Sequence, residues 1–156
     1  MTVIKLAQMS EEEITTAINS LNICRIAFID GNFPYISPFQ YVCINNKMFF
    51  HFTDYGKKKK ILEKNSNVCV SIEKFETDLS KYYFVSMQGT LRLVEDNQLK
   101  NHAMRKMAEL ARKNYSKTFL LAHGFEKEED WKILVSEDQI IYTLEVVNNP
   151  IGLKST

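Results

Sequence analysis

The residues with the most distinctive chemistry lie at positions 49–60, where the sequence reads FFHFTDYGKKKK. In an extended strand alternate side chains take opposite faces, so His51 and Thr53 would share one face while Phe50 and Phe52 share the other. The two phenylalanines suit the interior of a barrel. An imidazole and a hydroxyl would then lie in a row on the outside, just before the glycine and the four lysines.

The lysines open a predicted short helix over residues 57–65, at the end where their charge is least favourable. A helix N-terminus carries a partial positive charge and free N–H groups, so lysines there reduce stability unless an anion lies close. A phosphate would supply that anion, with Thr53 donating its hydroxyl and Gly56 allowing close approach of the backbone. A solvated run of lysines explains the same residues, and both interpretations stay open.

The predicted strand over residues 34–44 contains a second candidate contact surface. Pro38 interrupts this run, and a proline within a strand indicates an edge or a bulge. The residues that follow it, Phe39, Gln40 and Tyr41, would keep free backbone groups, to which a flat heterocycle with donors and acceptors along its edge could pair. The alternative is an edge strand that proline merely shields from other chains.

Hydrophobic periodicity and turn residues predict the elements that must position these side chains. Ser10 and Glu13 form a capping-box pattern at the start of the first helix, and Asn45-Asn46 is a hairpin signal. Gly89 indicates a bulge or a close approach within a run that is long enough for one bent strand or two. The predicted helices span about 11–21, 57–65 and 97–115, and the predicted strands span 23–29, 34–44, 48–53, 68–75, 82–95 and 139–147.

This order of elements predicts a mainly β protein with helices (α+β). About six strands joined mostly by short turns favour a small antiparallel barrel with peripheral helices over a doubly wound parallel sheet. We expect one domain over 1–156, with a core at about 10–147, an irregular part at 116–136 and a loose C-terminal tail.

Composition excludes several classes of protein. Twenty basic and 19 acidic side chains leave a formal net charge of +1, which argues against a dedicated nucleic-acid binder. The N-terminal residues show no basic region followed by an apolar core, and no apolar run is long enough to span a bilayer, so we expect a cytoplasmic protein with no membrane partner. The three cysteines fit buried, reduced thiols.

Known catalytic and metal-binding patterns are missing. His51, His102 and His123 are far apart in sequence and form no HExxH pair, and no cysteine pair has metal-ligand spacing, so we expect no metal site. The glycine-rich nucleotide loops and the nucleophile elbow are also absent from the sequence.

The ordered set of motifs nevertheless resembles a known family. It comprises Gly31, Pro34-Tyr35, Pro38, Tyr41, Phe49-Phe50-His51, Gly56-Lys57-Lys58, Asn65 and Val68. This set is similar to the FMN-binding split-barrel family, which includes pyridoxamine 5′-phosphate oxidase, and within it the nitroimidazole-resistance group of flavin-nucleotide-binding proteins. The similarity is good over about residues 10–95 and loose elsewhere.

The resemblance implies a six-stranded antiparallel split β-barrel that forms a homodimer, with FMN in grooves between the two subunits. Lys57 and Lys58 would contact the FMN phosphate, with Lys58 the stronger candidate. Phe52 and Thr53 match the family's aromatic-Thr positions beside that phosphate.

The flavin ring would lie against strand backbone. Phe39, Gln40 and Tyr41 match the positions where the family lays its backbone along the isoalloxazine. His51 matches the histidine that the nitroimidazole-resistance group keeps near the flavin and that has been linked to its activity.

Three positions depart from the family pattern or stay open. Phe84 stands where relatives offer a Ser or Gln to the cofactor, and Ser86 or Gln88 would have to substitute. The basic residues that bind pyridoxal phosphate in true pyridoxamine-phosphate oxidases have no match near the C-terminus, so that activity is not assigned. Trp131 either covers the flavin or substrate pocket or belongs to the core or an interface.

The sequence therefore supports a hypothesis with named rivals. The first is an FMN-dependent oxidoreductase or reductase of small compounds, nitroaromatic ones among the candidates, in which His51 donates a proton to the substrate or only orients the ring. The second is a flavin-binding or storage module without a substrate. The third is a small barrel that binds single-stranded nucleic acid through lysines and aromatic residues. Haem or deazaflavin in place of FMN also stays open.

Overall fold

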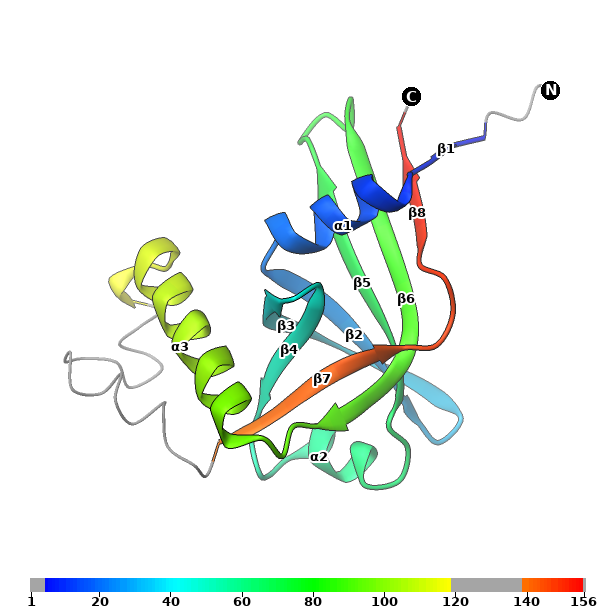
Figure 1. Ribbon diagram of the computed structural model, residues 1–156. Coiled ribbons are helices and arrows are strands. Elements are labelled where there is room, and N and C mark those ends of the chain that lie inside the picture. Colours follow the sequence, from blue (N-terminus) through cyan, green and yellow to red (C-terminus); the bar gives the residue numbers. More distant parts are fainter. Residues whose placement is uncertain (1–4, 119–138, 156) are drawn as a thin grey trace.

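The computed structural model describes residues 5–118 and 139–155, which form an antiparallel barrel with helices outside it (Figure 1). The order around the barrel is β6-β5-β2-β3-β4-β7, and pairing of β7 with β6 closes it. The fold predicted from sequence is therefore confirmed. The barrel strands are β2 (Ile23–Asp30), β3 (Phe33–Ile44), β4 (Lys47–Phe52), β5 (Asn67–Phe75), β6 (Tyr82–Leu93) and β7 (Ile140–Val146).

Turn chemistry sets the register of the strands that carry the candidate site. Asn45 and Asn46 have φ values of 51° and 61° and join β3 to β4, as the hairpin signal predicted. Both values lie in the left-handed region that asparagine tolerates and that a two-residue hairpin turn requires. The turn at Gly31, with φ of 64°, joins β2 to β3.

In the described residues, three helices lie outside the barrel: α1 (Glu11–Ser20), α2 (Lys57–Leu62) and α3 (Asn97–Asn114). The predicted capping box of α1 is present, because the Ser10 hydroxyl accepts from Glu13 N–H and the Glu13 carboxylate accepts from Ser10 N–H. None of the helices in the described residues is both long and apolar enough to cross a membrane.

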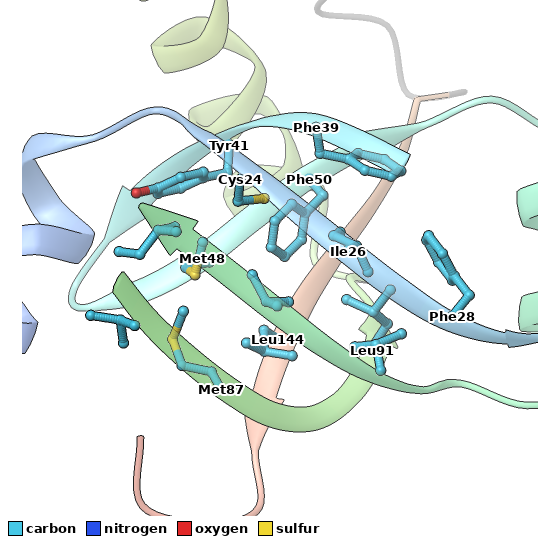
Figure 2. Close-up of a cluster of buried hydrophobic side chains, with 14 of the residues drawn as sticks. Cys24, Ile26, Phe28, Phe39, Tyr41, Met48, Phe50, Met87, Leu91 and Leu144 are labelled. Carbon is cyan, nitrogen blue, oxygen red and sulfur yellow. The ribbon is translucent and has the colours of Figure 1, made fainter. Parts of the chain in front are cut away.

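The core has two parts. The larger fills the barrel, and it includes Phe28, Tyr41, Phe50 and Phe52 (Figure 2 labels the first three). The smaller lies on the outer face under α3, where Phe49 packs with side chains of that helix. The predicted placement of Phe50 and Phe52 inside the barrel is confirmed by exposures of 0% and 3%.

The three cysteines are free thiols, and two of them are buried. Burial raises the pKa of Cys24 to about 12, so this thiol stays protonated at neutral pH. Cys43 is also buried and its pKa is raised for the same reason.

The prediction of a loose C-terminal tail was wrong. Residues Ile151–Lys154 form β8, which pairs with the part of β6 that extends beyond β7, and β1 (Ala7–Gln8) pairs with β8 in turn. Gly152 lies against Ile14 and Met9, where an added Cβ would come within 2.9 Å of either side chain. Backbone pairing and a glycine contact hold this segment, and neither produces an apolar pattern in the sequence.

Residues 82–93 form one continuous strand, in which the close approach predicted at Gly89 is present. Gly89 pairs with Val146 of β7, and a Cβ added at Gly89 would lie 2.4 Å from the carbonyl oxygen of Glu145. That atom belongs to the paired backbone that closes the barrel, so it has little freedom to move.

Replacing Gly89 with alanine should therefore destabilise the fold. We expect Gly89→Ala to lower the free energy of unfolding by at least about 2 kcal/mol, measured by urea denaturation, because overpacking here displaces backbone. The control is Gly31→Asn, since Gly31 has φ of 64° with nothing within 4 Å of an added Cβ. Asparagine tolerates that conformation, so equal losses in the two variants would contradict the close-approach explanation.

Candidate ligand site at the open edge of the barrel

The candidate site begins where β3 and β4 separate. β3 pairs with β2 from Phe33 to Gln40, but its register with β4 runs only from Tyr41, opposite Phe50, to Ile44. Among the described strands, the first two thirds of β3 therefore have an open edge. The open strand edge that we predicted from Pro38 is confirmed.

The backbone of β3 shows which groups face that edge. The N–H of Tyr41 donates to the carbonyl of Asn22 at 2.9 Å, on the β2 side. Because backbone groups alternate sides along a strand, those of Gln40 and Pro38 point the other way. The open edge thus presents the N–H of Gln40 and the carbonyl of Pro38, while the backbone N–H of Tyr41 is already bonded.

Three of the candidate cofactor residues direct their side chains into the barrel. Tyr41 is fully buried and its hydroxyl donates to the carbonyl of Ile18, and Phe39 packs with Phe52 at a ring separation of 4.8 Å. A ligand outside the barrel would meet the backbone of these residues before their rings.

Gln40 and His51 are the next residues beyond the last pair of β3 with β4. Both alternate with inward-facing neighbours, so both lie on the outer face, beside the apolar cluster under α3. The Nε2 atom of Gln40 is buried and has no hydrogen-bond partner within residues 5–118 and 139–155.

His51 is mostly removed from solvent and hydrogen bonds to the side chain of Gln139. Burial lowers the pKa of His51, and the bond to Gln139 offsets this only in part. The imidazole is therefore neutral at pH 7.

Two of the four lysines have carboxylate partners within the chain. Lys57 Nζ lies 2.8 Å from Asp30 and Lys59 pairs with Asp54, and these bonds raise the pKa of both lysines. The unfavourable charge at the start of α2 is thus partly compensated without a ligand. Lys58 differs, because its Nζ lies 5.0 Å from the ring centroid of Phe39 and meets no carboxylate among the described residues.

The segment between β4 and α2 is arranged differently from the sequence-based expectation. β4 ends at Phe52, so Thr53 is exposed beyond the strand, and its hydroxyl donates to the carbonyl of Tyr55 at 3.0 Å. This hydroxyl is occupied as a donor and would have to rotate to serve a phosphate. Gly56 precedes α2 with φ of 90° and leaves the helix without a side-chain cap.

The substitute contacts expected on β6 do not join this site within one chain. Phe84, Ser86 and Gln88 alternate with buried residues and so lie on the outer face, but β5 and β2 separate β6 from β3. The side-chain oxygen of Gln88 also accepts from the side-chain amide of Asn148 at 2.9 Å. Trp131 lies outside the described residues.

Two residues of the site were not found by sequence reasoning. One is Asp30, which lies beside the Gly31 turn and pairs with Lys57 of a helix that is distant in sequence. Gln139, the partner of His51, precedes the last barrel strand and carries no local motif that would reveal its role. In the described part of the chain, no group of three or more His, Cys, Asp and Glu side chains is placed to hold a metal ion.

Comparison with known proteins places this geometry in a family. The profile of the family described as pyridoxamine 5′-phosphate oxidase matches residues 10–130. The chain belongs to the pyridoxamine 5′-phosphate oxidase family. No curated protein matches it.

Solved structures share the fold at low sequence identity. An FAD-binding protein from Mesorhizobium loti has a TM-score of 0.71 and 13% identity, with 98% of this chain and 100% of that chain covered. A candidate 5-nitroimidazole antibiotic resistance protein from Bacteroides thetaiotaomicron has a TM-score of 0.66 and 18% identity, with coverage of 96% and 87%. An FAD and haem binding protein from Mycobacterium smegmatis has a TM-score of 0.65 and 13% identity, with coverage of 95% and 73%.

The environment of His51 predicts a pH effect that can be measured directly. Its pKa in the folded protein should lie below the ordinary value of about 6.5, so the unfolded chain takes up the proton first as pH falls. The contribution of His51 to stability should be constant above pH 6.5 or so and should decrease below it. Histidine NMR titration, with His51→Gln to assign the resonance, measures the pKa.

The same variant tests the effect on stability. His51→Gln should show a smaller loss of unfolding free energy than the wild type between about pH 6.5 and pH 5. A His51 pKa at or above its ordinary value would show that the imidazole is not buried as the geometry indicates.

Proposed function

We propose that the protein is a flavoprotein that binds FMN at the open edge of β3 and acts as an oxidoreductase on small compounds, nitroaromatic compounds among them. The observation that carries the proposal is the position of Lys58. The residue is half-buried, and its ammonium group lies over the ring of Phe39 and meets no carboxylate in the described residues. The next residue, Gln40, presents backbone groups to the open edge.

Lys58 suits the phosphate end of such a ligand. An ammonium group without a carboxylate partner can give its full charge to a phosphate, whereas a paired one must share it. Lys57 lies on the same side, 4.7 Å from the ring centroid of Tyr35, and would share its charge between Asp30 and the phosphate. The proposed contacts with the phosphate come from the two ammonium groups and do not depend on the dipole of the short helix α2.

The strand edge suits the ring end. The Gln40 N–H and the Pro38 carbonyl form a donor and an acceptor side by side, which complements a flat heterocycle that carries a carbonyl next to a ring N–H. The fold neighbours are named as FAD-binding or as FAD and haem binding, which supports a flavin and makes FAD and haem the competing ligands.

The geometry favours an orienting role for His51 over proton donation. When bound, the flavin supplies the hydride-transfer chemistry and the protein supplies position and electrostatics. A neutral imidazole held by Gln139 has a fixed orientation, and its lowered pKa leaves it without a proton to give at pH 7 in the unliganded protein. Its second ring nitrogen can still accept a hydrogen bond from a ring or substrate atom.

We also propose that two subunits form the complete site, as a homodimer. Three exposed isoleucines on β2 and β3 support this, since they lie on outer or edge positions that no helix of the described chain covers. Their exposures are 49% for Ile23, 47% for Ile29 and 60% for Ile36. Exposed apolar residues gathered on one sheet are typical of an association surface.

Flavin binding should depend on Lys58 more than on its neighbours in α2. We expect Lys58→Ala to weaken FMN binding at least about tenfold, because a charge-assisted bond to the phosphate is lost. The control is Lys60→Ala, since Lys60 is exposed on the same helix. Fluorescence quenching of FMN gives both dissociation constants, and circular dichroism checks that each variant is folded.

The outcomes separate the proposal from its rivals. Wild-type protein that binds neither FMN nor FAD would overturn the proposed function, and equal effects of the two lysine variants would move the phosphate elsewhere. Bound FMN that NAD(P)H cannot reduce would favour the storage module. Salt-sensitive binding of oligonucleotides that is lost in both variants would favour the nucleic-acid-binding barrel.

The dimer is tested by placing a charge on the exposed sheet. Ile36→Lys should shift the protein toward the monomer in sedimentation velocity and weaken FMN binding together with it, because a buried charge opposes association. The control is Leu79→Lys, since Leu79 is 62% exposed in the β5–β6 hairpin, at the opposite end of the sheet from the β2–β3 hairpin (Figure 1). A wild-type monomer that binds FMN with full affinity would contradict the two-subunit site.

A further inference from the structure

The side-chain amide of Gln40 is incompletely satisfied in the described part of the chain. Its Nε2 atom is buried and has no hydrogen-bond partner there. A buried donor that loses its bond to water without gaining another destabilises the folded state, and such groups are rare in native structures. The arrangement calls for a partner that comes from outside these residues.

The neighbouring polar groups do not supply that partner. His51 lies on the same outer face just across the separation of β3 and β4, but its side chain hydrogen bonds to Gln139. The residues that flank Gln40 on that face are Pro38 and Val42, which offer no side-chain acceptor. In the described residues, none of these neighbours forms a hydrogen bond with the amide nitrogen.

Gln40 also presents a second donor at the same place. Its backbone N–H points to the open edge, because the adjacent Tyr41 N–H points to β2, and the register with β4 stops before Gln40. Gln40 therefore carries a backbone donor at the open edge and a side-chain donor on the adjoining outer face. Two donors at one residue match an electron-rich oxygen or nitrogen and do not match a cation.

We propose that the Gln40 amide is a positioning residue that recognises a carbonyl-type acceptor of the flavin ring and favours the reduced flavin over the oxidised one. This inference rests on the proposed flavin site and goes beyond it. Reduction increases negative charge on the acceptor atoms of the ring, and a prearranged donor in a partly buried site stabilises the more negative form more strongly. Removing the donor therefore weakens binding of the reduced flavin more than that of the oxidised flavin.

The test compares the midpoint potential of FMN bound to the wild type and to two variants. Gln40→Leu removes the amide at similar size, and Gln40→Glu replaces it with a carboxylate that repels added negative charge. We expect the preference for reduced over oxidised FMN to fall about tenfold in Gln40→Leu, which is about 30 mV for a two-electron couple. The fall should be larger in Gln40→Glu.

A matched control and a second measurement keep the test specific. Gln98→Leu changes an exposed glutamine on α3 and should leave the potential unchanged. The unliganded Gln40→Leu protein should fold at least as favourably as the wild type in urea denaturation, because the variant removes a buried donor without a partner. A structural role for the amide would instead make this variant less stable.

The possible results distinguish the inference from the function on which it rests. If the wild type binds FMN and Gln40→Leu changes the preference for the reduced form by less than about twofold, the role of Gln40 is overturned and the flavin site stands. If the wild type binds no flavin, both are overturned. Loss of stability in unliganded Gln40→Leu with an unchanged potential would assign the amide to folding.

Discussion

The early end of the ladder between β3 and β4 is the constraint on which the candidate site depends. The barrel is closed by pairing of β7 with β6, and β2 pairs with both of its neighbours, β3 and β5. Beyond the pair Tyr41–Phe50, the two strands diverge and leave backbone groups of β3 without a strand partner. Pro38 makes this arrangement tolerable, because a proline lacks the N–H that would otherwise be stranded there. The interior is unaffected, since the aromatic rings of Phe39 and Phe52 pack against each other across the gap.

The lysines at the start of α2 have different partners, although the sequence shows a run of identical residues. Asp30 comes from the end of β2, and Asp54 from the loop before the helix, so acids from two different segments meet alternate lysines. Lys58 is set apart by the ring beneath it. An exposed ion pair contributes little to stability, so these pairs chiefly set where each ammonium group lies. The helix can therefore form without an anion, while the ammonium group of Lys58 remains available to bind one.

The sequence predicted the barrel, its strand order along the chain and the capping box because each has a local signature: alternation, turn asparagines and the Ser10–Glu13 spacing. It also predicted the edge at Pro38 and the close approach at Gly89. It failed for β8, a strand of four residues that is held by backbone pairing to a strand about 70 residues away. The partners of Lys57 and His51 were missed for a related reason. Contacts of Asp30 and Gln139 depend on how distant segments meet, and no spacing in the sequence records them.

Family membership shows the fold that holds the site but does not identify its ligand, because proteins with this fold are named as FAD-binding and as FAD and haem binding. The individual side chains narrow the choice. An unpartnered amide on Gln40 and an ammonium group on Lys58 that meets no carboxylate in the described residues call for acceptors, one neutral or weakly negative and one strongly negative. A ring with carbonyl groups joined to a phosphate would supply both acceptors, and this supports the flavin nucleotide proposed for the open edge of β3.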